Sequence, residues 1–530
     1  MHDLESTPVP DDSAVKVVQP QPAEERPSRP LAEGPVTAGR RKLPRAWQYT
    51  IAGGIVLLVL AVIFGSFLSV GHQPAKQATQ SRPTSETKPS YLPTPSGTEG
   101  DLFPNLGHAL LMTIADDVAY VGTADERIYA LRISNGSLLW RFEVEGEVSR
   151  QPLVANGVVY ISSLAGQNGP SHIYALRTGD GRLLWQYSSN SFSYISLSTT
   201  DSNVAYVSSG EGISAFKNGS LLWRVAISGF DSGVPQIVNG VVYASSFLEN
   251  GSGEVYALRA TDGTVLWHNT ADGFPVIPIV ADGVAYITSD GGVLTALRAS
   301  DGHQLWKQTI DADVIQSVQM VNGVIYTAAI KMSPGASIAP TTGPLLETMA
   351  NALLWNTRQM APARATIPLK LGVSSVYAIR ASDGKPVWHY SLANGKNSWV
   401  NWFAVEQGAV YASTTPMDGD DTSQGDVYAL QSGNGSVLWH DKLKVSPFRA
   451  LLANGVIYLS SSKGEDAGAV YAIQAKNGSL LWSYATSGPI QESPILADKA
   501  LYVGTINGII YALQAKNGAL LWHYPKANGS

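Results

Sequence analysis

The amino-acid sequence predicts an all-β protein, a β-propeller of eight or nine four-stranded blades preceded by one transmembrane helix. Two observations predict the propeller: a motif built around tryptophan recurs nine times, and each copy contains four short runs typical of β-strands. A third observation predicts the helix, an uninterrupted apolar stretch near the N-terminus. With 530 residues, of which 44% are hydrophobic, the chain is long enough to bury a large core.

The repeated motif reads Ala-Leu, four further residues, Gly, three further residues and Trp, and in most copies it follows a Val-Tyr or Ile-Tyr step. The third copy, from Ala215 through Gly219 to Trp223, is two residues shorter than the others. In a propeller such a tryptophan fills the space between neighbouring blades, so we expect these side chains to anchor the blades. The nine blade-anchoring residues are Trp140, Trp185, Trp223, Trp267, Trp306, Trp388, Trp439, Trp482 and Trp522.

Each copy divides into four strand-like runs, which in the last copy occupy residues 491–498, 499–505, 508–515 and 519–524. Asn-Gly or Asp-Gly dipeptides recur between the first and second runs and again between the third and fourth, where they favour tight hairpins. Closing such sheets into a ring buries both faces of every sheet and protects the sheet edges. Nine units are present in the sequence, which leaves a ring of eight or of nine blades open.

The strings YALRISNGSLLW, YALRATDGTVLW, YAIRASDGKPVW and YALQAKNGALLW resemble the tryptophan-docking repeat of the pyrrolo-quinoline quinone (PQQ) repeat propellers, over about residues 108 to 524. Where that family often has Asp two positions after the Ala, this chain has Arg or Gln in eight copies. The resemblance implies a propeller, usually of eight blades. In the family's dehydrogenases it implies PQQ bound over adjacent cysteines beside a calcium ion.

This chain contains no cysteine, and no block of it matches the calcium ligands or the catalytic Asp of those dehydrogenases. It is therefore more similar to the non-catalytic branch that includes outer-membrane assembly lipoproteins. That branch is anchored by a lipidated Cys, whereas this chain has a predicted helix. We accordingly predict no catalytic residue and no cofactor, with PQQ as the cofactor that the resemblance would allow.

The N-terminal part of the chain is predicted to hold the propeller at a membrane. Residues 1–46 are predicted to be a disordered tail, 47–70 a transmembrane helix and 71–103 a linker rich in Pro, Ser and Thr. Basic residues crowd the N-terminal flank of the apolar stretch, which places the N-terminus in the cytoplasm and the propeller, 104–526, outside the cell membrane. A cleaved signal peptide is the alternative, although its apolar region would be shorter.

Composition excludes several classes of function. The absence of cysteine excludes disulfides, thiolate metal sites and cysteine nucleophiles. The formal net charge of −6 argues against a nucleic-acid partner, because such proteins carry a basic excess. The sequence also contains no P-loop, no Gly-x-Ser-x-Gly and no His-Glu-x-x-His motif.

Three departures from the repeat are candidate sites. An insertion at 331–374 contains an apolar run in which Leu346, Met349 and Trp355 are candidates for partner contacts; packing on the rim is the alternative. The first strand of the seventh unit carries Trp399, Asn401 and Trp402, which are expected to form a stacking site or to pack the ring. The acidic residues Asp418, Asp420 and Asp421 are weak metal candidates, and a solvated loop is favoured there.

These observations together predict a single-pass membrane protein whose extracytoplasmic propeller acts as a non-catalytic binding or protein-assembly scaffold. The expected partners are other envelope proteins or a cell-wall polymer. A PQQ-dependent oxidoreductase and a polysaccharide-binding module are the two alternatives.

Overall fold

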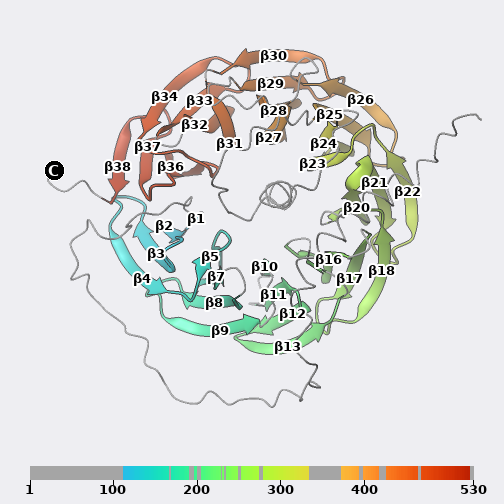
Figure 1. Ribbon diagram of the computed structural model, residues 1–530, viewed down its shortest axis with the longest axis horizontal. Coiled ribbons are helices and arrows are strands. Elements are labelled where there is room, and N and C mark those ends of the chain that lie inside the picture. The colour runs from blue at the N-terminus through green and yellow to red at the C-terminus, as the bar shows by residue number, and fades with distance from the viewer. Residues whose placement is uncertain are drawn as a thin grey trace, which may run out of the picture. The chain divides into compact units, whose positions relative to one another are not determined.

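The computed structural model describes residues 111–165, 169–189, 196–199, 204–227, 230–231, 234–248, 252–273, 278–332, 372–392, 398–416, 425–443, 445–463 and 467–525. These residues form nine antiparallel sheets, which follow one another around a ring in chain order (Figure 1). Within each sheet the strands pair in sequence order, from the innermost strand to the outermost. The predicted β-propeller is confirmed, and the ring has nine blades, numbered here 1 to 9 along the chain.

Blade 1 consists of β1 (Leu111–Ala115), β2 (Val118–Gly122), β3 (Arg127–Arg132) and β4 (Leu138–Glu143). Blade 2 consists of β5 (Glu147–Val148), β6 (Leu153–Ala155), β7 (Val158–Leu164), β8 (Ser171–Arg177) and β9 (Leu183–Ser189). Blade 3 consists of β10 (Ser196–Thr199), β11 (Val204–Ser209), β12 (Gly212–Lys217) and β13 (Ser220–Val225). Blade 4 consists of β14 (Phe230–Asp231), β15 (Gln236–Val238), β16 (Val241–Phe247), β17 (Gly253–Arg259) and β18 (Val265–Ala271). In blades 2 and 4 two short strands share the innermost position.

Blade 5 consists of β19 (Ile279–Ala281), β20 (Val284–Ser289), the 3-10 turn η2 (Asp290–Gly292), β21 (Val293–Arg298) and β22 (Gln304–Thr309). Blade 6 consists of β23 (Val314–Val321), β24 (Val324–Lys331), β25 (Val373–Arg380) and β26 (Pro386–Ser391). Blade 7 consists of β27 (Ser398–Glu406), β28 (Ala409–Pro416), β29 (Asp426–Gln431) and β30 (Val437–Lys442). Blade 8 consists of β31 (Ser446–Ala453), β32 (Val456–Lys463), β33 (Ala467–Gln474) and β34 (Leu480–Thr486). Blade 9 consists of β35 (Ile495–Ala497), β36 (Ala500–Gly504), β37 (Ile510–Gln514) and β38 (Leu520–Tyr524).

The repeated Asn-Gly and Asp-Gly dipeptides form two kinds of turn. Between the first and second strands both residues have positive φ, as at Asn156 (52°) and Gly157 (75°), which matches a two-residue hairpin. Between the third and fourth strands only the Gly has a positive φ in most blades. The residue before this Gly caps the turn with its side chain, as Asn135 Oδ1 does by accepting the backbone N–H of Ser137 at 3.0 Å.

Because the strands alternate in direction, both kinds of turn lie on one face of the ring. We call this the turn face. The opposite face, the loop face, carries the connections between second and third strands and the segments that join one blade to the next.

The repeated tryptophans join each blade to the following one. In eight of the nine copies the indole Nε1 donates a hydrogen bond of 2.7–3.0 Å to a backbone carbonyl just after the third strand of the next blade. The Gly of that blade's turn lies against the indole ring, as Gly384 does against Trp306, where a Cβ would come within 2.6 Å. This contact explains why Gly and Trp recur together in the motif.

A tyrosine of the second strand, distinct from the tyrosine that precedes Ala-Leu in the motif, packs beside the tryptophan of its own blade. Tyr502 and Trp522 have ring centroids 5.9 Å apart, and the Tyr502 hydroxyl donates to the same carbonyl as the indole, that of Ile133, at 3.3 Å. Apolar residues of the two neighbouring blades complete each interblade core. Burial therefore raises the pKa of Tyr502 to about 12.

The arginine found in place of the family's aspartate pairs with the turn of its own blade. Arg259 Nη1 lies 2.9 Å from Asp262 Oδ2, while Asp262 Oδ1 accepts the backbone N–H of Thr264 at 2.9 Å. Hydrogen bonds from Thr264 and Arg259 lower the pKa of Asp262 to about 2. The same pairing occurs at Arg177–Asp180, Arg298–Asp301 and Arg380–Asp383.

The predicted tail, membrane helix and linker lie outside the described residues. In the part of the chain that the structure describes, no helix is long and apolar enough to cross a membrane. The predicted insertion at 331–374 lies between β24, which ends at Lys331, and β25, which begins at Val373, and these two residues are register partners.

Candidate functional site

Blades 6, 7 and 8 differ from the rest in their innermost strands. β23, β27 and β31 contain 8, 9 and 8 residues, whereas β19 and β35 contain 3 each. Each of the three long strands has a β-bulge in its pairing with the second strand of its blade, at Gln316, Asn401 and Phe448. A bulge bends a strand and turns a side chain out of the regular alternation.

Two of the bulged residues connect their blade to the next. Gln316 Nε2 donates to the carbonyl oxygen of Val400 at 3.2 Å, which joins blade 6 to blade 7. Asn401 Nδ2 donates to the carbonyl oxygen of Pro447, and so joins blade 7 to blade 8. These carbonyls lie on inner strands, where no neighbouring strand of the same sheet is available on that side to bond them.

A third amide strengthens the connection between blades 6 and 7. Gln319 Nε2 donates to the carbonyl of Phe403 at 3.4 Å, and Gln319 Oε1 accepts the backbone N–H of Val405 at 2.8 Å. We call the side chains of Gln316, Gln319 and Asn401 the amide ladder. The ladder holds β23, β27 and β31 together as one continuous inner wall.

The structure assigns different environments to the three predicted residues of β27. Asn401 uses its amide within the protein, on Pro447 and Thr415. Trp402 packs against the apolar cluster between blades 7 and 8 that includes Tyr411 and Leu459. Trp399 lies on the same side of the strand as Trp402 and is half-buried as Trp402 is, but it is nearer the loop face.

The root of the long insertion lies beside Trp399. The Ser374 hydroxyl donates to the carbonyl of Ser398 at 2.5 Å, and the Ser398 backbone N–H donates to the carbonyl of Gly372 at 3.2 Å. Gly372 and Ser374 are among the first described residues after the insertion, and Ser398 directly precedes Trp399. The described root of the insertion and the strand that carries Trp399 therefore meet at the loop face of blades 6 and 7.

The other root of the insertion is fixed by charge. Lys331 Nζ lies 3.0 Å from Asp311 and 3.3 Å from Asp313, and the backbone N–H of Met332 donates to Asp313 Oδ2 at 2.8 Å. The Tyr377 hydroxyl donates to the Asp311 carbonyl at 2.8 Å. One end of the insertion is thus held by the segment between β22 and β23, and the other by β27 of blade 7.

Several candidate residues lie outside the described ranges. These are Leu346, Met349 and Trp355 of the insertion and Asp418, Asp420 and Asp421 of the acidic loop. The acidic loop connects β28 to β29, so it also starts from the loop face, on blade 7. In the described ranges no three His, Asp or Glu side chains converge closely enough to bind a metal ion.

Sequence reasoning missed a group of buried polar atoms next to this site. The hydroxyls of Ser398 and Thr414, which are 1% and 0% exposed as residues, and Gln316 Oε1 have no hydrogen-bond partner in the described structure. A buried polar atom of this kind keeps its capacity to bond a water molecule or a bound group. The sequence gives no signal for them, because serine and threonine also occur in the second strands of most other blades and nothing around Ser398 or Gln316 marks them as buried.

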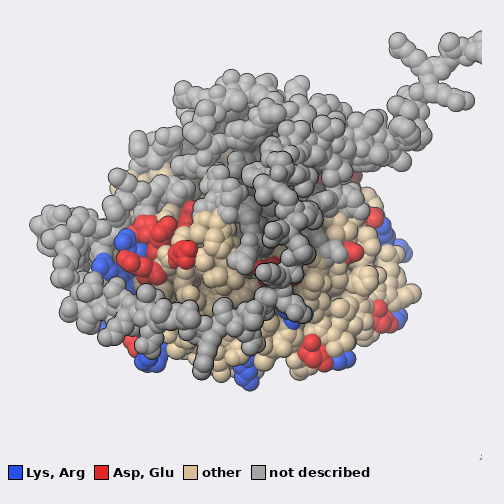
Figure 2. All heavy atoms as spheres, turned by 60° about the horizontal axis from the view of Figure 1, so that its bottom comes forward, with Lys and Arg blue, Asp and Glu red and all other residues tan. Residues whose placement is uncertain are grey.

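On the face that Figure 2 presents, the visible described residues form no large patch of a single charge. There, acidic and basic side chains form small mixed groups on a surface that is mostly uncharged. Such groups do not make the large field of one sign that steers nucleic acid.

Comparison with known proteins places the chain in a family. The chain is 27% identical over 170 residues to tetrathionate hydrolase of Acidithiobacillus ferrooxidans, which is 32% of this chain and 30% of that protein, so it spans less than a third of this curated relative. Among solved structures it is similar to BamB from Moraxella catarrhalis (13% identity, TM-score 0.43, covering 77% of this chain and 94% of that one). It is also similar to quinohemoprotein alcohol dehydrogenase from Comamonas testosteroni (11% identity, TM-score 0.39, covering 78% and 74%).

A family model matches residues 77–249, 209–417 and 423–530, which together make up most of the chain. Its description is outer membrane protein assembly factor BamB. The resemblance expected from the tryptophan motif is therefore confirmed, and the chain belongs to the PQQ_2 family of repeat propellers.

Proposed function

We propose that this protein is a non-catalytic scaffold that binds another envelope protein at the loop face of blades 6 to 8. In this proposal the predicted N-terminal helix holds the propeller at the outer side of the cell membrane. The family supports an assembly role, because its model carries the name of an assembly factor. The observation that carries the proposal is the pair of hydrogen bonds that fixes the root of the insertion to Ser398, next to Trp399.

The arrangement suits recognition of a protein surface. The amide ladder makes a rigid inner wall, and rigid elements position binding groups more accurately than loops do. Beside the wall, the long connection between β24 and β25 and the shorter one between β28 and β29 start from the same face. Long loops on a rigid scaffold commonly carry binding residues.

The alternative of a PQQ-dependent oxidoreductase has no residues to support it in the described ranges. The chain lacks cysteine, and the described Asp, Glu and His side chains form no group of three that fits a divalent cation. The alternative of a polysaccharide-binding module is less favoured, because Trp402, although only half-buried, packs against the apolar cluster between blades 7 and 8. We therefore favour the scaffold function over both alternatives.

Replacing the insertion tests the proposal. Because Lys331 and Val373 are register partners, a two-residue Asn-Gly turn can join them without disturbing β24 or β25. We expect this full-length variant to fold and to lose the cross-linked partner that the unaltered protein retains in intact membranes. The matched control joins Phe247 to Gly253 in blade 4 by the same turn, and should retain the partner.

An equal yield of the cross-linked partner from both loop variants would contradict the proposal. Addition of PQQ and Ca²⁺ to the unaltered protein distinguishes the oxidoreductase. Stoichiometric uptake, seen as quinone absorbance that stays with the protein, would contradict a non-catalytic role.

A further inference from the structure

The junction between blades 2 and 3 is built differently from the other eight. The third copy of the motif lacks two residues, so β12 and β13 are joined by a two-residue turn, Asn218 (φ 50°) and Gly219 (φ 80°), between the paired Lys217 and Ser220. The missing residues are part of the longer turn whose carbonyl accepts the tryptophan N–H at other junctions. Trp185 is accordingly the exception among the nine blade-anchoring tryptophans, since the other eight donate to such a carbonyl.

Trp185 still packs against blade 3, but by stacking. Its ring lies over Phe216 with centroids 6.1 Å apart and planes 22° apart, and Gly219 lies against its Cβ. Phe216 stands where most copies of the motif have leucine. The apolar contact at this junction is therefore kept, whereas the docking hydrogen bond on the turn-face side is not.

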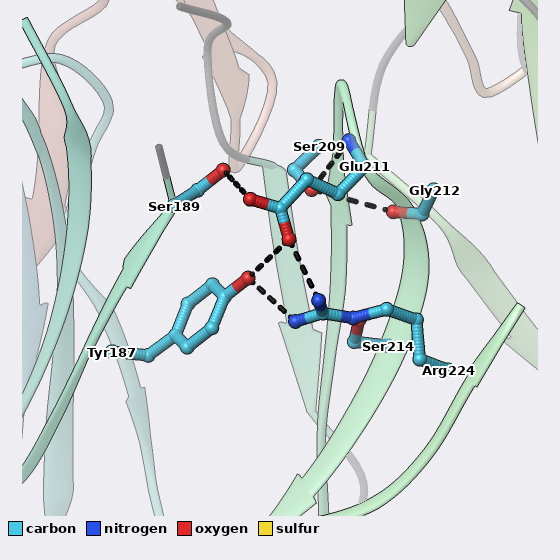
Figure 3. A network of polar contacts seen from close by, with 7 residues as sticks. All are labelled: Tyr187, Ser189, Ser209, Glu211, Gly212, Ser214 and Arg224. Atoms are coloured by element: carbon cyan, nitrogen blue, oxygen red, sulfur yellow. Dashed lines mark hydrogen bonds and ion pairs between the residues drawn. The ribbon is translucent and has the colours of Figure 1, made fainter. Parts of the chain in front are cut away.

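The loop-face end of the same junction carries a charged network instead. Glu211 Oε2 of blade 3 lies 2.7 Å from Arg224 Nη1 and accepts the Tyr187 hydroxyl of blade 2 at 3.1 Å, while Glu211 Oε1 accepts the Ser189 hydroxyl at 2.8 Å. Figure 3 shows Tyr187 and Ser189 reaching from β9 toward the Glu211 carboxylate, with Arg224 approaching the same group from β13. Arg224 Nη2 also donates to the Tyr187 hydroxyl at 2.6 Å.

The network is oriented by contacts within blade 3. Ser209 Oγ accepts the backbone N–H of Glu211 at 3.2 Å, and Arg224 Nε donates to Ser214 at 2.9 Å. The Arg224 guanidinium lies 5.6 Å from the centre of the Tyr187 ring, a cation–π distance. One carboxylate, one guanidinium and one phenol are thus the titratable groups that face one another from the β11–β12 turn, β13 and β9.

Because an ion-pair network replaces the tryptophan hydrogen bond, the junction between blades 2 and 3 responds to salt differently from the other junctions. A tryptophan N–H bound to a carbonyl carries no charge and is insensitive to salt or to mild acid. The Glu211–Arg224 pair is partly exposed, at 28% and 34%, so salt screens it. The pKa of Tyr187 is raised by burial, so its hydroxyl stays protonated and able to donate near neutral pH.

We propose that the junction between blades 2 and 3 is an electrostatic seam, the place where this ring opens first when salt weakens the Glu211 network. Opening separates β9 from blade 3 without breaking any sheet, because the network joins two blades and no strand pairing crosses the junction. Elsewhere the tryptophan docking bonds hold the ring closed.

Hydrogen exchange of the full-length protein, followed blade by blade, tests the seam. Amides of β9 and β13 should exchange at least about fivefold faster than those of β22 and β26, a ratio that one hydrogen bond accounts for. High salt should widen the ratio. In Glu211→Gln the ratio of exchange rates should already be large in low salt at pH 7, and it should no longer respond to salt. The control is Asp262→Asn, which removes the exposed Arg259–Asp262 ion pair inside blade 4 and should leave exchange in β9 and β13 unchanged.

A second variant restores the missing bond. Inserting Ala-Thr between Lys217 and Asn218 gives the third turn the length of the turn after Arg259 and gives Trp185 a carbonyl to dock on. In this variant exchange in β9 and β13 should fall to the level of the other outer strands. Uniform exchange among blades in the unaltered protein, or salt-independent exchange at the seam, would overturn the inference.

Discussion

The indole Nε1 of Trp522 donates a hydrogen bond of 2.8 Å to the carbonyl oxygen of Ile133, and this bond joins the last blade to the first. The two residues are 389 positions apart in the chain. Tyr502 donates to the same carbonyl, so the ring is closed by the contact that links its other blades. Closure therefore needs no strand exchanged between the two ends.

Replacing a docked tryptophan should cost more than replacing Trp185. Trp522→Phe removes a hydrogen bond to a carbonyl at a buried junction, whereas Trp185→Phe removes ring volume without that bond. We expect the free energy of unfolding of Trp522→Phe to fall by about 1–3 kcal/mol more than that of Trp185→Phe. Urea unfolding followed by circular dichroism measures the difference, and equal losses would contradict the role given to the docking bond.

Two glycines of blade 6 separate backbone strain from steric clash. Gly323 (φ 73°) and Gly384 (φ 71°) have the same strained conformation, but a Cβ meets nothing within 4 Å at Gly323 and meets Trp306 at 2.6 Å at Gly384. We expect Gly323→Ala to lower the free energy of unfolding by about 1–2 kcal/mol. Gly384→Ala should lower it by a further 1–3 kcal/mol, roughly, because the indole must move. Thermal unfolding of both variants gives the comparison, and equal losses would argue against packing of the turn on the indole.

Acid should weaken the protein partly through its turn aspartates. The pKa of Asp262 is lowered from 3.8 to about 2, so its contribution to stability is complete above pH 4 and is lost as the pH falls toward 2. In Asp262→Asn the dependence of the unfolding midpoint on pH should be shallower within that window and unchanged above it. A parallel curve for the variant would show that the Arg259 pair does not contribute.

Alkali should act through the buried tyrosines in the opposite direction. The pKa of Tyr502 is raised from 10.0 to about 12, so the neutral hydroxyl stabilises the fold below pH 10, and that stability is lost as the pH rises through 12. Tyr502→Phe should be less stable than the unaltered protein at pH 8 and should lose less stability between pH 10 and 12. Ultraviolet titration of tyrosinate during alkaline unfolding checks the assignment; the same alkaline loss in the variant would assign the effect to other groups.

The two tryptophans of β27 should behave differently. Trp402 is half-buried and packs against the apolar cluster between blades 7 and 8, so Trp402→Ala should lower the free energy of unfolding by about 2–4 kcal/mol. Trp399 is also half-buried but belongs to none of the apolar clusters of the described residues, so Trp399→Ala should cost less than about 2 kcal/mol. Urea unfolding of the two variants is the measurement, and the reverse order would place the binding ring at Trp402 instead.

The repeated motif predicts the fold because each of its residues has a local role that recurs. Trp, Gly and a second-strand Tyr occupy one interblade contact, and most of the two-residue hairpins that the structure describes have an Asn-Gly or Asp-Gly pair. Nine motifs mean nine blades only if all nine units belong to one closed ring. The hydrogen bond from Trp522 to Ile133 shows that they do, because it joins blade 9 to blade 1.

The amide ladder could not be predicted, because it depends on contacts between distant residues. Gln316 bonds to Val400, 84 positions away, and reaches it only because a bulge turns it out of the strand alternation. Nothing in the sequence around Gln316 marks that bulge. The shortened third turn is visible in the sequence, whereas the partnership of Tyr187 with Arg224, 37 positions apart, is not. The membrane helix stays a prediction.

The central claim is that binding takes place at the loop face of blades 6 to 8. A photo-cross-linking amino acid placed at Trp399, in the full-length protein in its own membrane, tests it most directly, with His303 on the turn face of blade 5 as the matched position. The account predicts a discrete protein adduct from position 399 and none from position 303. An adduct from 303 with none from 399 would contradict it.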